Sequence, residues 1–183
     1  MFLPHFLCLE SALLEVNFLE EIKSAFGKVG IGSGADEDKD TIFGILKQEH
    51  KLVQDNLHQI LSSNQLNDSL FQQTVDALNA HMKGEEELLY PRLEDNPNTR
   101  RLAFMAYDEH NLAKQLISTM STTSTDIDRW IARVTLLNNI LNNHIDMEER
   151  EVFPKAKEVL YAQTESDIRS RYLSQRQPTA PTA

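Results

Sequence analysis

An eleven-residue segment occurs twice in this chain of 183 residues, and this repeat constrains the fold more than any other feature of the sequence. The copies start at His81 and His144, and both read H-x-x-x-E-E-x-x-[LV]-[YF]-P. A Glu-His pair precedes each copy, at residues 49–50 and 109–110, so each half carries one histidine followed by an H-x-x-x-E motif. An internal repeat of this kind predicts two similar helix pairs that pack around one core with pseudo-two-fold symmetry.

Apolar residues follow a helical spacing in four consecutive segments, and none of these segments alternates as a β-strand would. Asp40 and Thr41 can cap the first helix, and the prolines at 91 and 154 are interpreted as stops of the second and fourth. Short connections between long amphipathic helices favour antiparallel neighbours, so we expect an all-α, up-down-up-down four-helix bundle. The expected helices span residues 40–60, 68–91, 99–120 and 126 to about 154 or beyond. Their apolar stripes include Phe43, Leu46, Val53, Leu57, Ile60, Phe71, Val75, Leu78, Leu88, Ile127, Ile131, Val134, Leu137 and Leu141.

The ends of the chain differ from this central part. Leu14, Phe18 and Ile22 lie at helical spacing, which predicts an additional N-terminal helix that packs on the bundle or contacts a protein partner or a second copy. Four of the six glycines follow this segment and precede a charged run, as is typical of a flexible linker. The predicted organisation is an amphipathic helix at 1–26, a Gly-rich linker at 27–39, the bundle at 40–162, and a short helix with a disordered tail at 163–183.

Composition excludes several classes of protein. The net charge of −10 argues against a nucleic-acid or anionic-membrane partner, because phosphate groups are bound by basic surfaces. No apolar run approaches the roughly 20 residues that span a bilayer. The apolar first nine residues carry no Lys or Arg, as a secretory signal would, so we expect a cytoplasmic protein. The single cysteine, Cys8, excludes an internal disulfide and any metal site built from cysteines alone.

The inward faces of the four predicted helices carry imidazoles and carboxylates. His50 continues the apolar stripe of the first helix, and His110 shares one face with Ala106 and Ala113 on the third. The histidine and first glutamate of each H-x-x-x-E motif are four residues apart, so they project to the same side, about 40° apart around the helix. The inward-facing set is His50, His81, Glu85, His110, His144 and Glu148.

Burial of these groups without partners would cost several kcal/mol each, which a cationic centre in the core would offset. Four imidazole nitrogens and two bridging carboxylates supply about eight donor atoms, and a shared oxo or hydroxo group adds two more. Two octahedral ions need about twelve positions, so a metal pair with about one open position on each fits this set. Nitrogen and oxygen ligation without sulfur favours iron, with manganese or zinc as alternatives.

Residues 40–160 resemble the hemerythrin-like family, the HHE cation-binding domain, through the two H-x-x-x-E-E…[YF]-P segments. The resemblance implies a four-helix bundle that holds a non-haem di-iron centre and meets dioxygen, nitric oxide or peroxide. By motif position, it implies the ligands His50, His81, Glu85, His110, His144 and Glu148, with the two glutamates bridging the irons.

Two departures from the family narrow the expected role. Oxygen-carrying hemerythrins have a fifth histidine one turn from the third-helix ligand, where this chain has Ala106 and Lys114. Members that repair iron–sulfur centres usually add a domain with a cysteine pair, which a chain with Cys8 alone does not contain. We therefore expect binding or sensing of a small oxidant in oxidative or nitrosative stress. The alternatives are an enzyme that turns over peroxide or nitric oxide, an iron donor in cluster repair, and an iron store.

Several residues near the expected ligands have two interpretations. For Glu49, Glu86, Glu109 and Glu149, a solvated helix face is expected for most, and orientation of a ligating histidine is the alternative. Tyr107 is expected to pack at the edge of its stripe or to donate to a bound oxygen species. Tyr90 and Phe153 are expected to be core plugs, and His58 to be solvated. Gly84 leaves room for an exogenous ligand or permits a close helix crossing.

Overall fold

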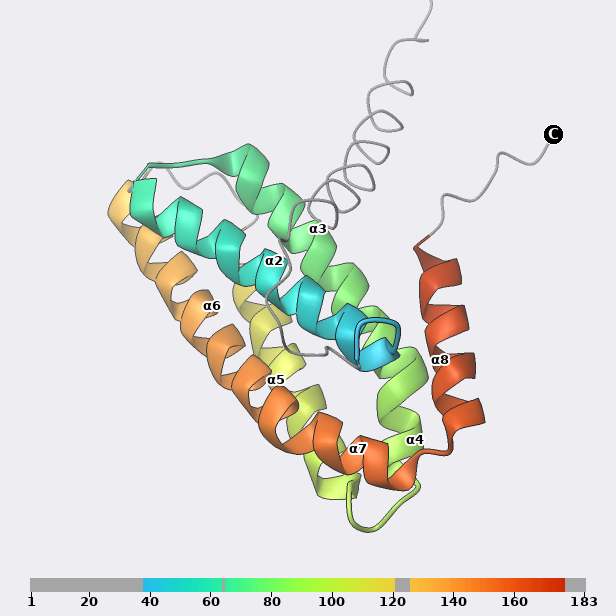
Figure 1. Ribbon diagram of the computed structural model, residues 1–183. Helices are drawn as coiled ribbons and strands as arrows, with labels where there is room; N and C mark the ends of the chain where they lie inside the picture. Colours follow the sequence, from blue (N-terminus) through green and yellow to red (C-terminus); the bar gives the residue numbers. More distant parts are fainter. Residues whose placement is uncertain (1–37, 64, 121–125, 177–183) are drawn as a thin grey trace, which may run out of the picture. The chain divides into compact units, whose positions relative to one another are not determined.

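The computed structural model describes residues 38–63, 65–120 and 126–176. The predicted N-terminal helix, nearly all of the Gly-rich linker and the last seven residues of the tail lie outside the described residues. Within the described ranges every regular element is helical, as the sequence predicts, and no strand occurs (Figure 1).

Four long helices form a helical bundle. They are α2 (Ile42–Ser63), α3 (Asp68–Gly84), α5 (Arg100–Ser118) and α6 (Ile127–Met147). Helix α2 packs against α3 and α6, and α5 packs against α6 and α3, so the two halves of the repeat contact each other along their length (Figure 1). A short helix, α8 (Ala162–Gln175), lies against α2 and against the segment that follows α3.

Side-chain caps mark where three of the four long helices begin, namely α2, α3 and α6. Thr41 Oγ1 accepts the backbone N–H of Gly44 at the start of α2, as expected for a capping threonine. Asn67 caps α3 through the N–H of Leu70, and Asp126 caps α6 through the N–H of Arg129. Each of these side chains satisfies a backbone N–H that has no acceptor within the first turn of its helix.

The core consists of two apolar clusters separated by a polar layer. One cluster includes Phe43, Leu46 and Leu89, and the other includes Leu57 and Trp130. Along each long helix the inward-facing residues pass from one cluster to the other through a histidine or a histidine and a glutamate. The polar layer therefore lies in the middle of the bundle, where apolar packing keeps it from water.

The second helix does not stop at Pro91, contrary to the sequence prediction, and the fourth continues past Pro154. Each passes through a π-helical turn, η1 (Glu85–Leu89) or η2 (Glu148–Val152), into α4 (Tyr90–Glu94) or α7 (Phe153–Val159). The prolines are tolerated because each lies in the first turn of the segment that follows, where a backbone N–H needs no helical acceptor.

In η1 the N–H of Tyr90 bonds to the carbonyl of Glu85, five residues back. The next bond in that pattern would run from Pro91 to the carbonyl of Glu86, but Pro91 has no N–H. The Tyr107 hydroxyl donates to that carbonyl instead, at 3.2 Å. The turn is thus stabilised by a side chain from α5.

One residue of the predicted core stripes lies outside the core. Ile127 is 50% exposed, whereas Trp130, three residues later, is 3% exposed and fills the end of the bundle against Phe71. The helix starts at Ile127, so its first residue projects beyond the facing helices. Among the described helices, none combines the length and the apolar character needed to cross a membrane.

Candidate metal centre

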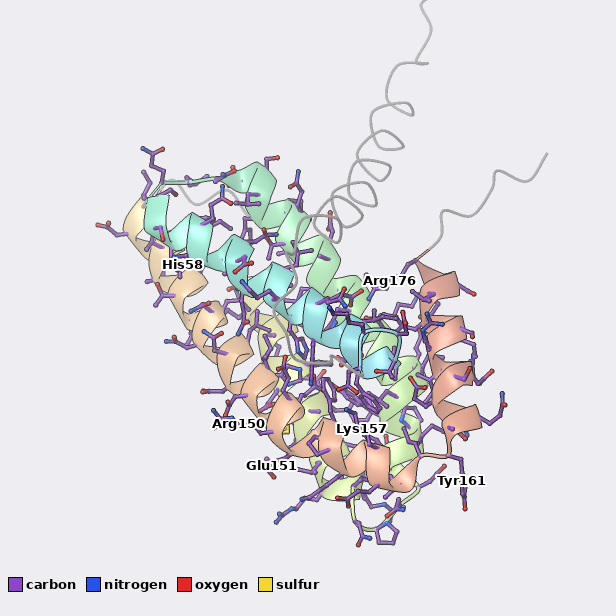
Figure 2. All side chains as sticks on the ribbon, viewed as in Figure 1. His58, Arg150, Glu151, Lys157, Tyr161 and Arg176 are labelled. Carbon is purple, nitrogen blue, oxygen red and sulfur yellow. The ribbon has the colours of Figure 1, made fainter. Side chains whose placement is uncertain are left out.

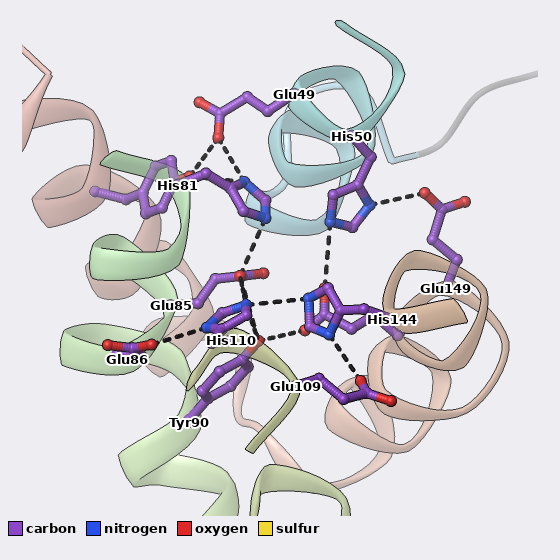
Figure 3. Close-up of polar contacts among 12 residues, drawn as sticks. Glu49, His50, His81, Glu85, Glu86, Tyr90, Glu109, His110, His144 and Glu149 are labelled. Atoms are coloured by element: carbon purple, nitrogen blue, oxygen red, sulfur yellow. Dashed lines mark hydrogen bonds and ion pairs between the residues drawn. The ribbon is translucent and has the colours of Figure 1, made fainter. Parts of the chain in front are cut away.

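The six residues predicted to be metal ligands come together in the polar layer of the bundle (Figure 3). All six are at most 3% exposed. Their donor atoms form two groups, in each of which the atoms lie within 4.8 Å of one another. The first group contains His50, His81, Glu85 and Glu148, and the second contains Glu85, His110 and His144.

Each inward carboxylate faces one imidazole from its own half of the repeat and one from the other half. Glu85 Oε2 lies 3.1 Å from His81 Nε2 and 3.5 Å from His110 Nε2. Glu148 Oε2 lies 3.2 Å from His50 Nε2 and 3.4 Å from His144 Nε2. This arrangement follows the pseudo-two-fold symmetry of the sequence, and it suits carboxylates that connect two positions.

Four partly buried glutamates hold the outer nitrogens of the four histidines, and this corrects the expectation that most of them are solvated. Every pair joins a carboxylate oxygen to Nδ1 at 2.9 Å (Figure 3). Two of the pairs lie within one half of the repeat, and two connect the halves. The pairs are Glu49 with His81, Glu109 with His144, Glu86 with His110, and Glu149 with His50.

These contacts decide which nitrogen of each ring carries a hydrogen. An ionised carboxylate only accepts hydrogen bonds, so each Nδ1 must donate, and in the neutral ring Nε2 then presents a lone pair to the interior. His110 Nε2 and His144 Nε2 lie 3.0 Å apart with both rings held in this way. Acceptors therefore converge from four rings and two carboxylates, and a cation between them satisfies all of them.

Four buried polar atoms of the candidate ligands have no hydrogen-bond partner. His50 Nε2, His81 Nε2, Glu85 Oε1 and Glu148 Oε2 are buried and form no hydrogen bond. Buried polar atoms without partners are rare in folded proteins and are explained most simply by a bound ion or water. The residues present thus fit a metal site.

Protonation shows how strongly the pocket favours positive charge. Burial alone lowers the pKa of His81, but the charge of Glu85 and the hydrogen bond to Glu49 outweigh it and raise the pKa to about 10. Burial likewise opposes ionisation of Glu148, yet the neighbouring histidines, His144 first, hold its pKa well below the usual range. The pKa of His50 is also raised, so without a metal these two imidazoles favour the protonated form beside the carboxylates.

Comparison with known protein families matches residues 41–156 to the hemerythrin HHE cation-binding domain. The chain belongs to this family. A DNA nickase from Nostoc sp. (strain PCC 7120 / SAG 25.82 / UTEX 2576) is 29% identical over 141 residues, which cover 73% of this chain. The matched region is 39% of that relative's own length, so the chain aligns with less than half of it. No solved structure gives a significant match to this chain.

The hemerythrin-like centre is not symmetrical, because the two repeats differ at one aromatic residue. The Tyr90 hydroxyl donates to Glu148 Oε1 at 2.7 Å and lies 3.3 Å from Glu85 Oε2 and 3.2 Å from His110 Nε2. Phe153, at the equivalent position, stacks on the His50 ring with centroids 5.8 Å apart. Both are buried as expected, but the interpretation of Tyr90 as a plain core plug missed its hydroxyl, which points into the metal centre.

The other candidate residues near the hemerythrin-like centre contact its surroundings and not the centre itself. Tyr107 packs edge-on against Tyr90, and its hydroxyl bonds to the backbone of η1 rather than to the centre. Lys114 points to Glu86, with its Nζ 2.6 Å from both carboxylate oxygens. His58 is exposed on α2, as expected (Figure 2). Gly84 permits close packing, since a Cβ there would lie 2.2 Å from the ring of Tyr172.

Proposed function

We propose that this hemerythrin-like protein holds a pair of iron ions in its polar layer and binds or senses dioxygen, nitric oxide or peroxide there. The observation that carries the proposal is the convergence of four imidazole nitrogens and two carboxylates, with every Nδ1 held by a glutamate. The proposed ligands are His50, His81, Glu85, His110, His144 and Glu148, with an oxo or hydroxo group shared between the ions.

The set of donor atoms supports both the proposed number of metal ions and their proposed identity. Glu85 belongs to both groups of donor atoms, and each inward carboxylate faces rings from both halves, which supports two positions bridged by Glu85 and Glu148. A mixed set of imidazole and carboxylate donors without sulfur favours iron over softer-ligand metals, and manganese or zinc are the alternatives. Such an iron pair with open positions supplies a redox-active site for small oxygen and nitrogen species.

The chain's own residues shape this site in three ways. The four outer glutamates keep the Nδ1 hydrogens in place, so the rings present Nε2 inward. The two apolar clusters on either side limit access of water. The Tyr90 hydroxyl places a hydrogen-bond donor beside Glu148 and His110.

Two other functions use the same residues. One is enzymatic turnover of peroxide or nitric oxide, or iron donation in cluster repair, and the other is iron storage. The Nostoc relative is a DNA nickase, and this chain matches 39% of that protein's length. We do not propose that activity here, because the net charge of −10 provides no basic footprint for a phosphate backbone.

For the rest of the chain, we propose the organisation that the sequence predicts. Neighbouring pairs of long helices support the up-down-up-down connectivity. We propose a cytoplasmic protein whose bundle occupies residues 40–162 and whose N-terminal helix at 1–26 contacts a partner or a second copy.

Metal analysis of the purified chain tests the proposal most directly. We expect close to two iron ions per chain, with a Mössbauer spectrum of magnetically coupled ions. A reproducible value of one uncoupled ion would contradict the dinuclear site. Steady consumption of peroxide or nitric oxide would favour an enzyme, a spectral change without turnover would favour sensing, and ready loss of iron to a chelator would favour storage.

A further inference from the structure

Glu49, which holds His81, is itself held by helix α8. Its Oε2 accepts from Nδ1 of His81 at 2.9 Å, from the Tyr172 hydroxyl, and from Nη2 of Arg176 at 3.0 Å. Arg176 also donates to the Tyr172 hydroxyl and stacks its guanidinium over that ring, 4.5 Å from the centroid. A chain of contacts thus runs from the inward group of donor atoms to the C-terminal end of α8, where Arg176 lies (Figure 2).

The ring of Tyr172 can pack in its place because this copy of the repeat has a glycine there. Its ring lies on Gly84, the residue just before Glu85, where any Cβ would collide with it. In the other half of the repeat, Met147 takes the position of Gly84. The ring is 1% exposed, so the hydroxyl must find its partner inside the protein, and Glu49 is that partner.

The attachment of α8 otherwise rests on few contacts. Ile168 joins Tyr172 in the core, and Glu165 accepts the N–H of Ile42 at the start of α2 at 2.6 Å. Gln175 donates to Glu87 at 2.9 Å. Most of the remaining surface of α8 is exposed. The contacts of Tyr172 and Arg176 with Glu49 are therefore a large share of what holds this helix.

We propose that Tyr172 and Arg176 are positioning residues of the metal centre, which orient His81 through Glu49. This inference rests on the proposed function, and it assigns a role to a helix that lies beyond the matched family domain at 41–156. A carboxylate fixed by a phenol and a guanidinium cannot rotate away from Nδ1 of His81, so Nε2 stays aimed at the first group of donor atoms.

A consequence is that metal binding and docking of α8 support each other. If a docked α8 raises metal affinity by holding His81, then bound metal must stabilise the docked helix by the same factor. The other half of the repeat has no such helix among the described residues, so the two metal positions are expected to differ in affinity.

Variants of the 183-residue chain test the positioning role. Tyr172→Phe keeps the ring on Gly84 and removes only the hydroxyl, and Arg176→Gln removes the cation. Loss of a side chain that orients a metal-bound histidine typically lowers metal affinity 10–100-fold. Tyr172 and Arg176 act through Glu49, so we expect the smaller effect, about a tenfold loss of affinity for one of the two ions. The measurement is an anaerobic titration of the metal-free protein with Fe²⁺ alone.

Matched controls separate positioning from general stability. Tyr161→Phe alters a tyrosine that is 83% exposed (Figure 2). Arg171→Gln alters an exposed arginine of α8 that forms a long ion pair with Asp167, at 3.9 Å. Both should bind iron as the unaltered chain does, and Arg176→Lys should restore most of the lost affinity. Equal weakening by the controls, or unchanged binding by Tyr172→Phe and Arg176→Gln, would overturn the proposal.

A second measurement needs no metal and keeps this inference separate from the proposed function. In the metal-free protein, ¹⁵N NMR of the histidines should show a slowly exchanging Nδ1–H on His81 that exchanges faster in Tyr172→Phe and Arg176→Gln. If the unaltered chain binds no iron, the proposed function fails, while this resonance still decides the positioning role. An Nδ1–H that exchanges at the same rate in all variants would overturn the positioning role.

Discussion

Tyr90 and Glu148 belong to opposite halves of the repeat, and the Tyr90 hydroxyl donates to Glu148 Oε1 at 2.7 Å inside the candidate metal centre. This bond connects the start of α4 to η2 and makes the two halves unequal, because the other repeat has Phe153 at the corresponding position. The hydroxyl is fully buried and the acceptor is ionised, so the contact is of the stronger, charge-assisted kind.

Tyr90→Phe should lower the free energy of unfolding of the metal-free protein by about 1.5–3 kcal/mol, because it leaves a buried carboxylate oxygen without its donor. Urea denaturation measures this. Tyr107→Phe is the matched control, since its hydroxyl bonds to a backbone carbonyl at 3.2 Å and should contribute about 1 kcal/mol or less. Equal losses in the two variants would mean that the Tyr90 bond is no stronger than an ordinary one.

The glutamates that join the two halves should control metal affinity. Glu86→Gln and Glu149→Gln each replace the ionised partner of a ligand Nδ1 and should weaken metal binding about 10–100-fold. Glu151→Gln, on the exposed side of η2, serves as the control and should leave affinity unchanged (Figure 2). Competition with a chelator of known affinity provides the measurement. Affinities that do not change in the first two variants would show that these contacts have no part in metal binding.

Metal binding and folding should be linked. An ion that binds the folded chain and not the unfolded chain stabilises it by about 4 kcal/mol when its concentration is a thousandfold above Kd. Removal of the metal should therefore lower the melting temperature. Glu85→Ala should lose both metal and this stabilisation, whereas Glu87→Ala, at an exposed position in the same turn, should change little. Calorimetry with and without metal decides this, and similar behaviour of the two variants would contradict the inward face assigned to Glu85.

The metal-free and metal-loaded proteins should respond to pH in opposite directions. The pKa of His81 is raised from 6.5 to about 10 and that of His50 is also raised, so their stabilisation is complete below about pH 6.5 and is lost as pH rises toward 10. Burial lowers the pKa of His110, which gives a contribution of opposite sign. Glu148, with a lowered pKa, stabilises above about pH 4.5 and loses this effect in stronger acid.

We therefore expect the metal-free protein to become less stable between pH 6.5 and 9, when urea midpoints are compared. Metal affinity should increase over the same interval, because metal ligation requires neutral imidazoles and protons compete for them. Proton release on metal addition, measured in weakly buffered solution, provides a second check. Parallel trends in the two forms would rule out protonated His50 and His81 as the metal-free state.

The loaded centre should react with small ligands without carrying oxygen reversibly. Oxygen carriers have a fifth histidine one turn from the third-helix ligand. At the two positions one turn from His110, this chain has a buried Ala106 and Lys114, which binds Glu86. Reduced protein exposed to oxygen should oxidise to a stable diferric form. The test is repeated oxygenation and flushing with inert gas, followed by absorbance. An oxygenated spectrum that disappears on flushing over several cycles would show a carrier.

The sequence predicted the helical fold and the six residues that meet in the core, because both depend on local periodicity. His81 and Glu85 share a face by their spacing alone, and the apolar stripe on which His50 lies turns it inward. The hemerythrin-like membership was likewise evident from the two repeated segments. The π-helical turns were missed, although the consecutive buried residues Leu88, Leu89 and Tyr90 before Pro91 were a usable signal, since a regular helix cannot turn all three inward.

By itself, then, the sequence determined which side chains lie inward on each helix, a property set within a few residues of backbone. The tertiary structure decided what those side chains contact. Glu149 reaches His50 across 99 residues, and Tyr172 reaches Glu49 across 123. Such pairs depend on how distant helices pack against each other, which the local spacing of residues does not encode. The partners of the outer glutamates and the role of α8 could therefore be known only once the helices were placed together.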